Sequence, residues 1–256
     1  MRIRRILPAF GVALLSGLAS MLTACAEEQP ERLVVLAAAS LQGALEEVAD
    51  DWSETGGTAP SLSYAATPAV ARQVAEGAPA DIVVTADSEW MDWLAERGLI
   101  GGLPQIVATN ALVVVAPRGG DAPMSLEEFA ADPDGGLIAL AETDNVPAGR
   151  FAREALERLG LWDALEARVV EGENVRAALA LAERGEVRLA IVYASDAQAA
   201  RRVQVVKRLD PALHRPIVYY AAITARSGRD DAAEFLDFLT SDQGRARIAS
   251  HGFGWL

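Results

Sequence analysis

The sequence predicts an α/β protein made of two lobes, each a doubly wound sheet. Short apolar runs alternate with helical patterns from Leu33 to the end of the chain, a rhythm typical of parallel sheets with helices on both faces. The length of 256 residues suits two such lobes. No stretch after residue 33 has the composition of a linker. We therefore expect strands to cross between the lobes, near 111–117 and 216–224.

The first lobe is predicted over residues 33–112 and 222–256. Its strands are short apolar runs rich in β-branched residues, and its helices end at glycines. Thr67 and Pro68 indicate a helix start, because threonine is a good N-cap and proline fits the first helical position. The predicted order is strand 33–38, helix 41–52, strand 59–66, a helix from 67, strand 81–86 and helix 87–98, with two helices at the end of the chain.

The second lobe is predicted over residues 113–221. Its first long helix has Phe151, Ala155 and Leu156 on one face, and the next helix starts at Asn174, a good N-cap. The predicted elements are strands 110–117 and 136–141, helices 146–160 and 174–185, and strands 187–194, 203–209 and 215–224.

The N-terminal segment reads as a targeting signal. The basic start MRIRR precedes an apolar run over 6–22 that is short for a bilayer span. The run ends in Leu-Thr-Ala followed by Cys25, which resembles a bacterial lipobox. We expect a lipoprotein signal peptide over 1–24, lipidation at Cys25 and a polar tether over 25–32. The protein would then be exported and anchored, facing the periplasm or the outer side of the plasma membrane. An ordinary signal peptide or an uncleaved anchor helix are the alternatives.

The composition excludes several classes of function. One cysteine and two histidines, His214 and His251, cannot form a Cys/His zinc site or an internal disulfide. They also disfavour Ser-His-Asp or Cys-His catalysis, and the chain has no G-x-S-x-G motif. A formal net charge of -13 disfavours binding to nucleic acid phosphates. We therefore expect a binding protein without catalysis or a cofactor, with a hydrolase-like enzyme as an alternative.

Four strand-to-helix junctions point to an anion site. They occur at Ser40, at Thr67, near Ala148 and at Val175. A helix start offers backbone N–H groups and partial positive charge, and the carboxyl ends of strands form the ligand crevice of open α/β sheets. The junctions could thus converge on one anion without Lys or Arg. Alternatively, each is only a structural cap, and Tyr193 at the end of a predicted strand is a core residue.

Several segments resemble one family over essentially the whole chain after residue 33. They include AAASLQGAL, GAPADIVVTADSEWMDWL, VPAG and ENVRAALALAERGEVRLAIVYASDA. The chain resembles the substrate-binding proteins of bacterial molybdate ABC transporters. The resemblance implies a type II periplasmic-binding fold, with lobes that close on molybdate or tungstate. It also implies ligand hydrogen bonds from the hydroxyls of Ser40, Thr67 and Tyr193 and from the main-chain N–H groups of Ala148 and Val175, with no direct metal-ion ligand.

The same resemblance implies two partners, an ABC permease and its ATPase. We expect the binding protein itself to be a monomer. The family commonly has serines where this chain has YAATP, so Ala66 brings no hydroxyl and Thr67 brings an extra methyl. A donor-only site should reject hydrogen phosphate, whose proton needs an acceptor. Asp144 is the nearest candidate acceptor in the sequence. Binding of sulfate or of a small organic anion, and a sensor or adhesion lipoprotein, remain the alternatives.

Overall fold

The structure is a computed structural model that describes residues 32–120 and 125–255. The predicted signal peptide, Cys25 and the tether before Arg32 lie outside the described residues. The contacts group Arg32–Leu256 into one compact unit that contains two five-stranded sheets. None of the helices described is long and apolar enough to span a bilayer.

The first sheet has the strand order β2-β1-β3-β10-β4. β1 runs parallel to β2 and β3, whereas β10 runs antiparallel to β3 and β4. The register pairs Ala38 with Ala65, so the carboxyl ends of β1 and β2 are level. The strands are β1 (Val34–Ala38), β2 (Ser61–Ala65), β3 (Ile82–Thr85), β4 (Ile100–Asn110) and β10 (Ile217–Thr224).

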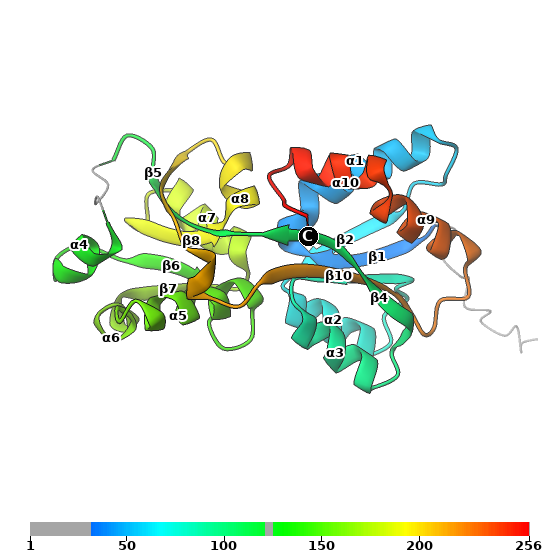
Figure 1. The fold of residues 1–256 in the computed structure, drawn as a ribbon, viewed down its shortest axis with the longest axis horizontal. Coiled ribbons are helices and arrows are strands. Elements are labelled where there is room, and N and C mark those ends of the chain that lie inside the picture. Colours follow the sequence, from blue (N-terminus) through cyan, green and yellow to red (C-terminus); the bar gives the residue numbers. More distant parts are fainter. Residues whose placement is uncertain (1–31, 121–124, 256) are drawn as a thin grey trace, which may run out of the picture. The chain divides into compact units, whose positions relative to one another are not determined.

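Helices cover both faces of the first sheet (Figure 1). α2 and α3 lie on one face, and α1, α9 and α10 lie on the other. On the α2 side the buried core contains Leu36, Val70, Val83 and Met91, which join the helices to the sheet. The elements are the 3-10 turn η1 (Ala39–Leu41) and helices α1 (Gln42–Glu54), α2 (Thr67–Ala75), α3 (Ser88–Glu96), α9 (Asp230–Thr240) and α10 (Asp242–Ser250).

The second sheet has the order β7-β6-β8-β5-β9, with α5 and α7 on opposite faces (Figure 1). β6 is parallel to β7 and β8, and β5 is antiparallel to β8 and β9. Its strands are β5 (Leu112–Pro117), β6 (Ile138–Ala141), β7 (Val169–Gly172), β8 (Leu189–Tyr193) and β9 (Val203–Arg208). Its helices and turns are α4 (Leu126–Ala131), α5 (Pro147–Arg158), α6 (Trp162–Leu165), η2 (Glu166–Arg168), α7 (Val175–Glu183), α8 (Ala194–Ala199) and η3 (Pro211–Leu213).

Two connections link the sheets, as predicted, but the sheets are mixed and not purely parallel. The chain passes from β4 to β5 through Ala111 alone, and from β9 to β10 through residues 209–216. Leu112 at the start of β5 pairs with Tyr193 at the end of β8. A strand that enters a sheet at the carboxyl ends of its neighbours must run antiparallel to them, which explains the mixed pairing.

The residues of the two sheets differ slightly from the predicted lobes, which were 33–112 and 222–256 for the first lobe and 113–221 for the second. Leu112 already belongs to the second sheet, and β10 lies in the first sheet over its whole length. The division into two lobes with these ranges stays a prediction, because residues Arg32–Leu256 form one compact unit by their contacts.

Candidate functional site

All five residues predicted to bind the anion line one cavity. Ser40, Thr67, Ala148, Val175 and Tyr193 come from elements of both sheets and surround about 230 Å³ of space, which includes the opening to solvent. The remaining lining consists of Ala38, Ala39, Ala65, Ala66, Ala86, Val146, Pro147 and Asn174. The residues at the carboxyl ends of β1, β2, β3 and β8 are thus brought together with the starts of α5 and α7.

Ser40 lies buried in η1 and does not cap a helix, so the alternative in which it is only a structural cap is wrong. The N-cap positions of η1 and α1 are Ala38 and Leu41, and neither has a side-chain cap. The Oγ of Ser40 lies instead 2.8 Å from the hydroxyl oxygen of Tyr219 on β10. Ser40 lines the cavity, and its hydroxyl is held from β10 and not by a backbone N–H of its own helix.

Thr67 is also not the N-cap, because Ala66 occupies that position and Thr67 is the first residue of α2. Its Oγ1 accepts a hydrogen bond of 3.2 Å from the backbone N–H of Ala86. A hydroxyl has one proton and two lone pairs, so this contact leaves the Thr67 proton available for another acceptor. Ala86 follows β3 at the same edge of the sheet, and the strand-end rule applied to β1 and β2 would have predicted it as a lining residue.

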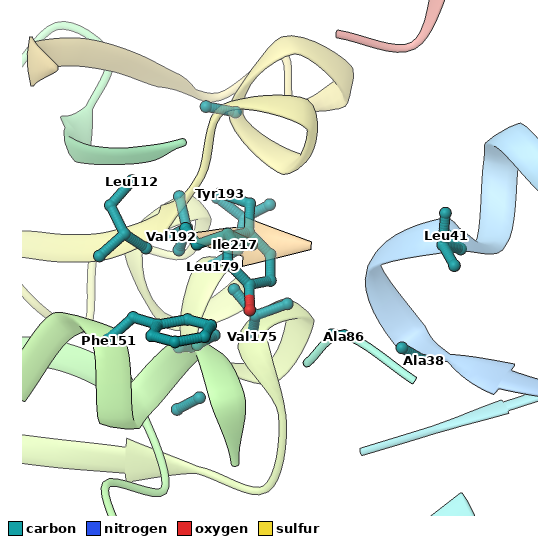
Figure 2. Close-up of a cluster of buried hydrophobic side chains, with 14 of the residues drawn as sticks. Ala38, Leu41, Ala86, Leu112, Phe151, Val175, Leu179, Val192, Tyr193 and Ile217 are labelled. Carbon is teal, nitrogen blue, oxygen red and sulfur yellow. The ribbon is translucent and has the colours of Figure 1, made fainter. Parts of the chain in front are cut away.

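Tyr193 ends β8 and is buried, with 1% of its surface exposed. Figure 2 shows its side chain extending toward Val175, with the hydroxyl oxygen at the tip. This hydroxyl has no hydrogen-bond partner among the residues described. Burial first, and then the nearby Tyr219, Asp87 and Asp196, raise the pKa of Tyr193 well above its ordinary value. The group therefore keeps its proton and can donate it to a ligand.

Ala148 and Val175, at the starts of α5 and α7, both line the cavity. Asn174 caps α7 as predicted, with its side chain accepting from the N–H of Ala177 at 3.0 Å. At α5 the N-cap is Val146, which has no side-chain cap. The first N–H groups of a helix have no partner within it, so both starts offer donors to an anion.

The cavity wall carries no formal charge: the described lining includes no Lys, Arg, His, Asp or Glu. Asp144, the candidate acceptor, is exposed and pairs with Arg153 at 3.3 Å, outside this lining. Over residues 32–120 and 125–255, no group of three or more His, Cys, Asp or Glu side chains could hold a metal ion. The polar groups of the lining residues are hydroxyls, the N–H groups of helix starts and the Asn174 amide, whose oxygen already accepts from Ala177. This chemistry suits hydrogen-bond donation to an anion.

A buried ion pair follows two of the lining residues in the sequence. Arg176 comes after Val175, and Asp196 comes three residues after Tyr193. The Nε of Arg176 lies 3.3 Å from Oδ1 of Asp196, whose side chain is completely buried. Burial raises the pKa of Asp196 to about 7, and the positive charge of Arg176 opposes this rise.

Contacts between α3 and the second sheet's elements join the two sides of the cavity. Arg150 of α5 forms ion pairs with Asp87, at 3.3 Å, and with Glu89 of α3. Arg215 pairs with Glu89 and, at 2.6 Å, with Glu154 of α5. In addition, the indole N–H of Trp90 on α3 donates to the carbonyl oxygen of Asn145 at 3.0 Å. The arrangement described is therefore one in which both sides are in contact.

Tyr219 and Asn110 were not predicted, although they contact the polar side chains around the cavity. Tyr219 is in the middle of a strand whose nearly continuous apolar sequence gave no functional signal, and its partner Ser40 is 179 positions away. Asn110 ends β4, a strand that the prediction missed apart from this residue. No local sequence pattern marks such a pair.

The comparisons with known proteins agree with this geometry. The family model of bacterial extracellular solute-binding proteins matches residues 33–254. The molybdate-binding protein ModA of Escherichia coli is 35% identical over 87% of this chain and 88% of its own length. YvgL of Bacillus subtilis, provisionally named an ABC transporter substrate-binding lipoprotein, is 31% identical over 94% of this chain and 93% of its own.

Solved structures show the same fold. The periplasmic molybdate-binding protein of Azotobacter vinelandii has a TM-score of 0.78 at 24% identity, covering 88% of this chain and 100% of that one. The sulfate-binding protein SubI of Mycobacterium tuberculosis has a TM-score of 0.74 at 18% identity, with 87% and 86% covered. From its match to the family model and its identity to these relatives, the chain belongs to the bacterial extracellular solute-binding proteins, in the family of the molybdate-binding protein ModA.

Proposed function

We propose that this protein captures molybdate, and tungstate equally, outside the cytoplasm and delivers it to an ABC permease and its ATPase. The observation that carries the proposal is the cavity without charged side chains, lined from both sheets by hydroxyl residues and by the starts of helices. Membership in a family of solute-binding proteins, which are not enzymes, agrees with a transport role.

Binding would rest on hydrogen bonds to a doubly charged tetrahedral ion. A buried dianion is costly without compensation, but each bond from an uncharged donor to a charged acceptor contributes about 1.5–3 kcal/mol. The hydroxyls of Ser40, Thr67 and Tyr193 and the N–H groups of Ala148 and Val175 are the proposed donors. After the costs of ordering and closure, about five to seven such bonds would give roughly micromolar to nanomolar affinity.

The same donors would select among oxyanions. Hydrogen phosphate carries a proton that needs an acceptor, and the cavity lining has no carboxylate to receive it. Molybdate and tungstate differ little in size, so we expect little discrimination between them. Sulfate has the same charge and shape but is smaller, so only the size of the cavity separates it from molybdate.

Isothermal titration calorimetry of the mature lipoprotein in detergent tests this function. We expect heat of binding with molybdate and tungstate and none with phosphate. The variants Tyr193→Phe and Ser40→Ala should each weaken molybdate binding by about 1–3 kcal/mol, because each removes one donor. Unchanged affinity in both variants would show that these hydroxyls do not bind the ligand, and phosphate bound as tightly as molybdate would contradict the donor-only site.

Sulfate is the second candidate ligand, and Thr67 is the observation that favours it. Thr67 belongs to the cavity wall, and a methyl group directed into the cavity would reduce the space for a large ion. Tighter binding of sulfate than of molybdate in the same titrations would favour this alternative.

The proposal includes a lipid anchor at Cys25 and a monomeric binding protein. The lipobox pattern supports the anchor, and a lipoprotein cysteine with at least two acyl chains would hold stably in the membrane. The cavity supports the monomer, because one chain supplies its lining from both sheets.

Cys25→Ala should move the protein from the membrane fraction to the soluble fraction, and retention in the membrane would contradict lipidation at this residue.

A further inference from the structure

Asn110 starts a chain of hydrogen bonds that leads to the cavity. Its Oδ1 accepts from the backbone N–H of Ala111 at 3.0 Å. Because a backbone N–H can only donate, this contact fixes which end of the amide is oxygen. The Nδ2 group therefore faces the other way, 2.8 Å from Oγ of Ser195 and 3.4 Å from the hydroxyl oxygen of Tyr219.

The direction of the chain then passes to Tyr219. Its hydroxyl oxygen accepts from Asn110 at 3.4 Å, and Oγ of Ser40 lies 2.8 Å away. Either hydroxyl can be the donor of that contact, and the lone pair that Asn110 occupies favours Tyr219 as the donor. Tyr219 is completely buried, and this burial raises the pKa of its hydroxyl, which keeps the proton. Edge-on contacts with Tyr193 and Phe253, at ring-centroid distances of 6.1 and 5.4 Å, hold the ring in place.

Ser40 is the last member of the chain. If its Oγ accepts from Tyr219, the proton of Ser40 must point to another acceptor. Ser40 is buried and belongs to the cavity wall, so that proton is directed into the cavity.

We propose that Tyr219 is a positioning residue that fixes Ser40 as a donor and thereby determines the rejection of oxyanions that carry a proton. The inference rests on the proposed oxyanion site and adds a residue that does not contact the ligand. Without the Tyr219 hydroxyl, Ser40 could rotate and accept the proton of hydrogen phosphate, while it could still donate to a fully deprotonated ion.

The test compares the affinities for molybdate and for inorganic phosphate at mildly alkaline pH, measured by calorimetry on the full mature chain. Tyr219→Phe keeps the ring and removes the hydroxyl. We expect the affinity for molybdate to fall by less than about tenfold. The ratio of the molybdate affinity to the phosphate affinity should decrease by about tenfold or more. Tyr220→Phe, a change of the next residue on the same strand, is the matched control and should leave the ratio unchanged.

A double-mutant cycle separates positioning from a general loss of structure. In the Ser40→Ala background, Tyr219→Phe should have no further effect on the ratio, because the hydroxyl that it orients is gone. Asn110→Ala removes the donor that sets the direction of the chain of hydrogen bonds, so it should also decrease the molybdate-to-phosphate affinity ratio. This variant also serves if Tyr219→Phe does not fold.

The outcomes distinguish this inference from the proposed function. In one outcome the wild type binds molybdate and rejects phosphate, while Tyr219→Phe and Asn110→Ala leave the molybdate-to-phosphate affinity ratio unchanged. That result would overturn the role of Tyr219 and leave the proposed function standing. A wild type that binds sulfate and not molybdate would overturn the proposed function, and the sulfate-to-phosphate ratio would then provide the same test. A wild type that binds phosphate as tightly as these ions, or binds none of them, would overturn the inference.

Discussion

Asp196 shows how one residue can link the site to protein stability. Its carboxyl is completely buried, three residues after Tyr193 of the cavity wall, and burial raises its pKa to about 7 against the opposing charge of Arg176. In the unfolded chain an aspartate titrates near its ordinary pKa of about 4. The folded state therefore holds a proton over a pH range in which the unfolded state has released it.

This difference predicts a pH-dependent loss of stability. As the pH rises from about 4 to about 7, the folded state binds more protons than the unfolded state, so the free energy of unfolding falls, by on the order of 4 kcal/mol in total. Asp196→Asn removes this contribution, and the variant should gain stability relative to the wild type across that window. Urea unfolding at a series of pH values measures it, and two curves that stay parallel would contradict the raised pKa.

Thr67 allows a second prediction at this scale, about selectivity. Thr67→Ser keeps the Oγ that accepts from the Ala86 N–H and removes only the methyl group. The enlarged cavity should raise the molybdate-to-sulfate affinity ratio by about tenfold, since one methyl group in a fitted pocket is worth about that much. Competition calorimetry measures the ratio, and an unchanged value would show that the Thr67 methyl does not touch the ligand.

At the scale of elements, the position of α5 depends on a glycine in its first turn. A Cβ added at Gly149 would lie 2.2 Å from the carbonyl oxygen of Glu142 and 2.3 Å from that of Ala141. Real Cβ atoms do not come so close to a backbone oxygen, so only glycine lets α5 begin against the end of β6. Ala148, the residue before this glycine, lines the cavity.

Gly149→Ala should therefore push the start of α5 away from β6. We expect a loss of about 1–3 kcal/mol in the free energy of unfolding, from backbone overpacking, together with weaker anion binding. Gly228→Ala is the control, because a Cβ there meets nothing within 4 Å. Thermal unfolding and calorimetry measure the two effects, and a Gly149→Ala protein that behaves like the control would contradict the role of the close approach.

The elements also show how far the sequence could predict the site. Strand ends and helix starts are local patterns, so the junctions at Ser40, Thr67 and Asn174 were found, although the first two were wrongly assigned as caps. β4 was missed because Gly101, Gly102 and Pro104 interrupt its pattern. Hydrogen bonds between distant segments, such as that from Tyr219 to Ser40, depend on strand pairing that no local signal contains.

At the scale of the whole molecule, contacts across the cavity favour the arrangement in which both sides meet. Glu89 of α3 pairs with Arg150 and Arg215, and its side chain is about half exposed. Such exposed ion pairs contribute only about 0–1 kcal/mol each, so if the lobes open and close, these pairs would adjust that balance and would not dominate it. The ligand, with donors on both sides, would supply the larger part.

Glu89→Gln removes both ion pairs and should weaken molybdate binding about two- to tenfold, because only the closed form contains them. The difference from the wild type should shrink at high salt, which screens exposed charges. Glu186→Gln is a matched control, because Glu186 pairs with Arg184, two residues earlier, and this ion pair does not connect the two sides of the cavity. Calorimetry at two salt concentrations measures the effect, and equal losses in both variants would contradict a role in closure.

The hydrogen bond from Trp90 to Asn145 has a practical consequence. The indole belongs to α3, its partner precedes α5, and the two are 3.0 Å apart only while both sides are in contact. Separation would remove this hydrogen bond and expose the half-buried ring further to water, which would shift its ultraviolet emission to longer wavelength. The protein thus carries an intrinsic fluorescent reporter, and the speed of capture could be followed in a stopped-flow instrument without attaching a dye.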